Sequence, residues 1–241
     1  LDTLGSGHTS FYDEAMNRIG IEQEAFRRMW AIRVADLIDY QNLAYARKYV
    51  DHIARVYEAD RQNGGSDHRF RLTYWTAFVL YKLMAYKDEY EVARLLTGEK
   101  ERNIRKAFDG RVRLSYNLHP PLLRERDLDR KIRLGPWFRP ILKAMAHMKF
   151  LRHTPFDLFG RTKARREEQS LVSWYEGLID AALNVLTPDS YPEVVELLRL
   201  PEEIRGYEEV KHRSIVRVKS RTDQMVKQLE ASHRQPVETL S

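Results

Sequence analysis

Two carboxylates that share one face of a predicted helix are the first residues to consider for chemistry. Asp88 and Glu91 lie in the charged run 86–91, and their spacing of three places them side by side on a helix. Paired carboxylates can carry out acid–base catalysis when they are shielded from water. Lys87 and Arg94 lie close by in the sequence, which favours a solvated face on which these charges neutralise one another.

Signatures of metal and phosphate sites are missing from the sequence. There is no cysteine, which excludes disulfides, thiolate nucleophiles and cysteine-ligated zinc or iron–sulfur clusters within these 241 residues. The eight histidines are scattered, and no His-Glu-x-x-His run occurs. His52 falls on an apolar stripe and is interpreted as a core histidine. Gly5 and Gly7 have no preceding strand and no third glycine, and no Gly-Asp-Gly motif for thiamine diphosphate is present.

Basic residues exceed acidic ones by 41 to 35, which is weak evidence for an anionic partner. They cluster in 161–166 and 211–221 without a nucleic-acid recognition motif. Solvated faces or a protein interface are therefore favoured, and nucleic-acid binding is not expected. Gln41 and Asn42 interrupt an apolar run, and we expect them to fix helix register or to satisfy loop backbone groups.

Composition sets the class of protein. Hydrophobic residues make up 43% and charged residues 32%, which is typical of a globular chain with a solvated surface. No run of about 18 apolar residues occurs, so we expect no membrane-spanning helix. The first residue is Leu1 and nothing near it is typical of a signal peptide. We expect a cytoplasmic chain that is processed, engineered or cut from a longer one.

The elements that must position these residues are predominantly helical. Apolar residues recur at intervals of three and four over 21–60, 68–97, 163–186 and 207–229, which predicts helices there. Asp109-Gly110 lies between two short runs and predicts a hairpin over 103–118. The predicted fold is mainly α, a multi-helix domain with one small β-hairpin. We expect an N-terminal lead-in and helix over 1–33, a helical accessory domain over 34–231 and a flexible tail over 232–241.

One helix over 68–97 would carry its tyrosines, Tyr86 and Tyr90, on its apolar stripe. The charged face with Lys87, Asp88 and Glu91 would then meet either the basic loop 124–133 or another domain.

Several segments together resemble the C-terminal helical region of large fused indolepyruvate ferredoxin oxidoreductases. The resemblance covers about residues 34–220. It is carried by YQNLAYA at 40–46, KLMAYKDEYEVARL at 82–95, PPLL at 120–123, LR at 151–152, TPFD at 154–157, FG at 159–160, LPEEIRGY at 200–207 and VK at 210–211.

The resemblance implies a supporting part of an enzyme. In that family thiamine diphosphate attacks a 2-oxoacid, carbon dioxide leaves, electrons pass through iron–sulfur clusters to ferredoxin, and coenzyme A takes the acyl group. Those steps need a Gly-Asp-Gly…Asn motif and Cys-x-x-Cys runs, which this sequence lacks. The chain is therefore expected to be a non-catalytic segment without a cofactor of its own, while the parent enzyme would hold thiamine diphosphate, magnesium and [4Fe-4S] clusters.

The expected partners are other domains of the parent enzyme or a second copy in a homodimer. The candidate interface residues are Lys87, Asp88, Glu91, Arg94 and Arg205, and no catalytic, cofactor-binding or metal-binding residue is assigned. The alternative function is a freestanding helical binding module for an anionic partner. Sequence upstream of Leu1 separates the two, because a parent oxidoreductase would carry the thiamine and cysteine motifs there.

Overall fold

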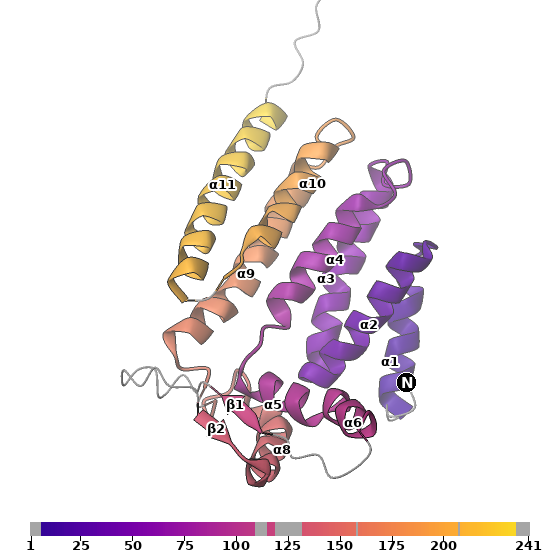
Figure 1. Ribbon diagram of the computed structural model, residues 1–241. Helices are drawn as coiled ribbons and strands as arrows, with labels where there is room; N and C mark the ends of the chain where they lie inside the picture. Colours follow the sequence, from indigo (N-terminus) through magenta and orange to yellow (C-terminus); the bar gives the residue numbers. More distant parts are fainter. Residues whose placement is uncertain (1–5, 109–114, 119–131, 158, 207, 235–241) are drawn as a thin grey trace, which may run out of the picture. The chain divides into compact units, whose positions relative to one another are not determined.

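The computed structural model describes residues 6–108, 115–118, 132–157, 159–206 and 208–234 (Figure 1). The described chain is mainly α-helical, as predicted. It divides into two compact units. The large unit comprises 1–86 and 162–241, and the inserted unit comprises 87–161. None of the described helices is long and apolar enough to cross a membrane.

The large unit is built from long helices that share one apolar core. Its elements are α1 (Ser6–Asn17), α2 (Glu24–Tyr40), α3 (Leu43–Gln62), α4 (Arg71–Met84), α9 (Lys163–Asn184), α10 (Tyr191–Arg199), the 3-10 turn η3 (Leu200–Glu203) and α11 (Glu208–Arg234). The predicted stripe on α9 is buried and contributes Leu171, Tyr175, Leu178, Ala182 and Val185 to this core. Burial of such a stripe is what makes an amphipathic helix stable in a folded chain.

Asn42 separates α2 from α3 because its side chain caps α3. Its backbone is extended, with φ −169° and ψ 177°, and its side-chain oxygen accepts the N–H of Tyr45 at 2.9 Å. This geometry satisfies one of the unpaired N–H groups at a helix start. The backbone group that Asn42 satisfies belongs to the start of a helix and not to a loop, and the helical stretch 21–60 forms two helices.

A buried aspartate joins the end of α3 to α4 and α10. Asp60 is fully buried and accepts the N–H and hydroxyl of Thr73 at 2.8 and 2.7 Å. The hydroxyl of Tyr191 donates to the same carboxylate at 2.8 Å. In the following turn, a side chain at Gly65 would place its Cβ 2.3 Å from Asp60 Oδ1, so this position requires glycine.

The inserted unit is smaller and contains α5 packed against α8. Its elements are α5 (Glu89–Thr97), α6 (Glu99–Lys106), β1 (Tyr116–Leu118), β2 (Ile132–Leu134), the 3-10 turn η1 (Pro136–Phe138), α8 (Arg139–His147) and the 3-10 turn η2 (Met148–Leu151). Ala93, Tyr116 and Leu142 form its buried core, against which Leu96, Leu134, Phe138, Met145 and Ala146 pack.

The hairpin predicted over 103–118 is wrong in its first arm. Residues 103–106 belong to α6, whose Glu, Lys and Arg residues are good helix formers. Strand β1 instead pairs antiparallel with β2, in the register Tyr116↔Leu134. The turn signal Asp109-Gly110 lies outside the described residues. A small antiparallel pair therefore exists, but the partner of β1 follows it in the sequence instead of preceding it.

The single helix predicted over 68–97 is two helices, because the chain leaves helical geometry at 85–88. Asp88 is extended, with φ −83° and ψ −177°, and its side chain accepts the N–H of Glu91 at 2.7 Å. It is thus the N-cap of α5. Tyr86 and Tyr90 are both buried, but they lie in different units and do not share a helix face.

Candidate functional site

Asp88 and Arg152 form a buried ion pair in the inserted unit. Their side chains are 4% and 1% exposed. Arg152 donates from Nε and Nη2 to the two carboxylate oxygens, at 2.5 and 2.8 Å. Such a two-point pair is directional and holds both groups in one orientation. The Asp88 carboxylate is therefore a helix cap and a counterion at once.

Tyr90 and Asp157 continue this network through the loop after η2. The Tyr90 hydroxyl donates to Asp157 Oδ1 at 3.2 Å, and the N–H groups of His153 and Gly160 donate to the same carboxylate. The Tyr90 ring meets Phe159 edge to face, with the centroids 5.2 Å apart. Burial, and then the negative charge of Asp157, raise the pKa of Tyr90 well above its ordinary value.

Acid–base catalysis by the predicted carboxylate pair does not fit this arrangement. Asp88 is bound to Arg152, and both oxygens of Glu91 accept hydrogen bonds from Arg94 at 2.8 Å. A general base needs a free lone pair directed at a substrate proton. These carboxylates instead hold arginines, so their role is to fix the local fold.

The five candidate interface residues are placed differently from one another. Asp88 and Glu91 are buried within the inserted unit, and Arg94 is partly exposed beside Glu91. Lys87 is exposed. Arg205 belongs to the large unit, where it is 70% exposed and forms an ion pair with Glu202. Lys87, Arg94 and Arg205 are thus the accessible members, and their contact with a partner stays a prediction.

The segment 82–95 is contacted by five other segments that carry the family resemblance. In the large unit, Tyr40 and Tyr45 donate to the carbonyls of Tyr86 and Met84 at 3.0 and 3.1 Å. Lys82 donates to the carbonyl of Glu202 at 2.6 Å, and burial lowers its pKa.

In the inserted unit, Arg152 donates a hydrogen bond to Asp88 of the same segment. Tyr90 donates a hydrogen bond to Asp157, and its ring contacts the ring of Phe159. Sequence reasoning missed these partners because they lie more than 60 residues away along the chain. The available signal was the pair of motifs LR and TPFD, which carry the resemblance and contain Arg152 and Asp157.

His52 is not the core histidine that was predicted. Its side chain is 20% exposed, and its Nε2 lies 3.5 Å from Glu176 Oε1 on α9. Burial lowers the pKa of His52, and this effect outweighs the opposing charge of Glu176.

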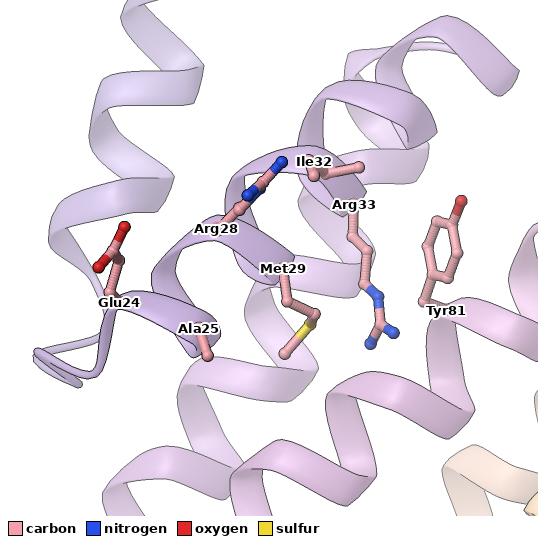
Figure 2. Close-up of a pocket in the computed structure, with 7 residues that line it drawn as sticks. All are labelled: Glu24, Ala25, Arg28, Met29, Ile32, Arg33 and Tyr81. Carbon is pink, nitrogen blue, oxygen red and sulfur yellow. The ribbon is translucent and has the colours of Figure 1, made fainter.

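An open pocket of about 620 Å³ lies on the outer side of α2. Figure 2 shows Arg33 and Tyr81 next to each other in it, with Met29 beside them. The Arg33 guanidinium lies 4.7 and 5.0 Å from the ring centroids of Phe78 and Tyr81. These cation–π contacts anchor the arginine to the fold, and the pocket brings together no nucleophile and base.

Two observations bear on the cofactors of the resembling family. The sequence has no cysteine to ligate a cluster. Among the residues that the structure describes, no three His, Asp or Glu side chains are grouped so that they could hold a metal ion.

Exposed apolar side chains are concentrated on the inserted unit. Trp137, Phe150 and Phe156 are 65%, 68% and 74% exposed. Among the described residues of this unit, Ile104, Phe108, Ile141 and Met148 are also large, apolar and exposed. Exposed aromatic and apolar groups gathered on one small unit are typical of a docking surface.

Comparison with known proteins identifies the family. Residues 26–224 match a family of unknown function, DUF6537, and the chain belongs to this family. No curated protein and no solved structure matches the chain significantly.

Proposed function

We propose that this chain is a non-catalytic helical domain of an enzyme similar to indolepyruvate ferredoxin oxidoreductase. In such an enzyme it packs against the catalytic domains or forms part of the dimer. The parent carries out thiamine-dependent oxidative decarboxylation of aryl 2-oxoacids and passes electrons to ferredoxin. Its thiamine diphosphate, magnesium and [4Fe-4S] clusters are bound by other parts of the enzyme.

The convergence of the resembling segments on 82–95 carries this proposal. Segments with catalytic duties would be expected to direct unpaired acids, bases or ligands toward a shared cavity. Here Asp88, Tyr90 and Lys82 are each bonded to another resembling segment of the chain. The shared residues therefore maintain the connection from α4 to α5, which is a structural duty and suits a supporting domain.

The alternative, a freestanding module for an anionic partner, is favoured by one observation. Residues 87–161 contain 18 lysines and arginines against 10 aspartates and glutamates, which is a net charge of +8, whereas the whole chain carries +6. The basic excess of the chain thus resides in the inserted unit. A domain that docks on an acidic part of its own enzyme would show the same bias.

Expression of the chain alone and of the native polypeptide that contains it tests the proposal. The native polypeptide should reduce ferredoxin or a viologen dye in the presence of an aryl 2-oxoacid, thiamine diphosphate and coenzyme A. It should also show the broad visible absorbance of iron–sulfur clusters. The chain alone should show neither property. A native polypeptide that is colourless and inactive toward every aryl 2-oxoacid would contradict the proposal.

A further inference from the structure

Residues 130–156 combine positive charge with apolar side chains. This stretch contains seven arginines and lysines and no aspartate or glutamate. Its described part forms β2, η1, α8 and η2. Two of its arginines are neutralised inside the unit, because Arg139 pairs with Glu101 at 2.7 Å and Arg152 pairs with Asp88. Arg133 and Lys143 are exposed and add positive charge to the surface of the inserted unit.

Helix α8 has two apolar sides, of which the fold covers one. Leu142 is 1% exposed, and Met145 and Ala146 pack in the same core. The other side carries Ile141 and Ala144, which are three residues apart on α8. Trp137 in η1 and Met148 in η2 flank the helix, and we call these four residues the α8 face. Trp137, Ile141 and Met148 are 65%, 44% and 36% exposed.

A polar rim borders the α8 face. Lys143 and His147 lie on α8 between its apolar residues, and both are exposed. An apolar centre containing tryptophan and methionine, surrounded by a polar rim, is the usual anatomy of a protein-binding surface. The charge of Lys143 and the net charge of +8 over residues 87–161 disfavour a like-to-like contact between two copies of this face and favour an acidic counterpart.

We propose that the α8 face docks on an acidic protein surface with apolar residues at its centre, which the catalytic part of the parent enzyme supplies. The assignment of the partner surface to the parent enzyme rests on the function proposed above. The acidic and apolar character expected of that surface rests on the charge and the exposed side chains of the α8 face. Trp137 is the anchor, and Lys143 pairs with carboxylates at the rim of the contact.

Oxidative footprinting of the native polypeptide and of the chain alone tests the proposal. Tryptophan and methionine side chains oxidise readily when they are exposed, and mass spectrometry reports each residue separately. Trp137 and Met148 should oxidise about five-fold more slowly in the native polypeptide than in the chain alone, as expected for side chains at the centre of an interface. Equal oxidation in both would overturn the proposal.

A matched pair of variants isolates the α8 face. Ile141→Glu places a carboxylate at an exposed position of this face, and Ile32→Glu makes the same change at an exposed position of α2 in the large unit. Both should leave the melting temperature of the chain alone unchanged. In the native polypeptide, Ile141→Glu should restore fast oxidation of Trp137, and Ile32→Glu should leave it protected. Equal effects of the two variants would contradict docking at α8.

Two further outcomes identify other occupants and would overturn the proposal. The first is protection of Trp137 in the chain alone by phosphatidylcholine vesicles with about 30% phosphatidylglycerol, which indicates a lipid surface. The second is protection that accompanies dimerisation of the chain alone. The activity assay keeps the two proposals separate. An active enzyme with an exposed Trp137 would refute the docking inference alone, and a protected Trp137 in an inactive polypeptide would refute the proposed oxidoreductase alone.

Discussion

Replacement of Arg152 by methionine should destabilise the inserted unit strongly. The substitution removes both hydrogen bonds to Asp88, whose side chain is 4% exposed. The carboxylate then stays buried with the Glu91 N–H as a remaining donor. Leaving one member of a buried ion pair uncompensated costs about 3–5 kcal/mol. The loss should appear in the inserted unit first, because both residues and the helix that Asp88 caps belong to it.

Amide hydrogen exchange on α5 is the suitable assay, because it reports the stability of one part of a chain. The free energy of opening measured on α5 amides should fall by about 3–5 kcal/mol in Arg152→Met. Arg133→Met is the matched control, since Arg133 is exposed on β2, and its effect should stay within about 0.5 kcal/mol.

The double variant Asp88→Asn with Arg152→Met sharpens the test. Asparagine retains the capping oxygen for the Glu91 N–H, while no unpaired charge is left buried. The double variant should therefore be more stable than the sum of the two single changes predicts, by about 1–3 kcal/mol. If Arg152→Met opened α5 no more easily than Arg133→Met, or if the two changes were additive, the reasoning about this pair would be refuted.

Three further predictions concern other buried groups. Tyr90→Phe should lower the free energy of unfolding in urea by about 1 kcal/mol, because it removes the hydrogen bond from the hydroxyl to Asp157. Tyr90→Ala should lower it by about 3–5 kcal/mol, because it leaves a cavity. Equal small effects of the two changes would show that the ring is not packed as described. Asp60→Ala should lower stability by about 3 kcal/mol or more, since three donors lose their acceptor; a melting temperature close to that of the unchanged chain would contradict this. His52 has a pKa below its ordinary value in the fold, so the unfolded chain binds its proton more tightly, and stability should decline as the pH falls through about 6.5. His52→Gln should show a smaller loss over that range in urea titrations, and identical pH profiles would argue against the shift.

The helical faces of the large unit were predictable from the sequence, because they depend on apolar residues that recur at intervals of three and four. The stripe with Leu171, Tyr175 and Leu178 is buried as its spacing predicts. The break at 85–88 was not predictable from period alone. Helix α4 ends at Met84, Asp88 caps α5, and the burial of Asp88 depends on Arg152, which lies 64 residues away along the chain.

Strand pairing and surface exposure could not be predicted for a similar reason. The predicted hairpin over 103–118 ends at strand β1, but the partner strand β2 begins 16 residues after Tyr116 instead of preceding it. In α8 both apolar sides have helical spacing, and only tertiary packing decides that Leu142 is covered and Ile141 is not. The candidate interface residues Asp88 and Glu91 were chosen for their charge, but in the fold these charges bind Arg152 and Arg94 of the same unit.

The sequence of the native polypeptide on either side of this chain tests the central claim most directly. If the chain is a supporting domain of a 2-oxoacid ferredoxin oxidoreductase, the same polypeptide should carry a Gly-Asp-Gly…Asn motif and Cys-x-x-Cys runs upstream of Leu1. Intact mass and peptide sequencing of the purified native protein would show them. A native protein that carries neither motif, in this polypeptide or in a subunit that copurifies with it, would contradict the claim.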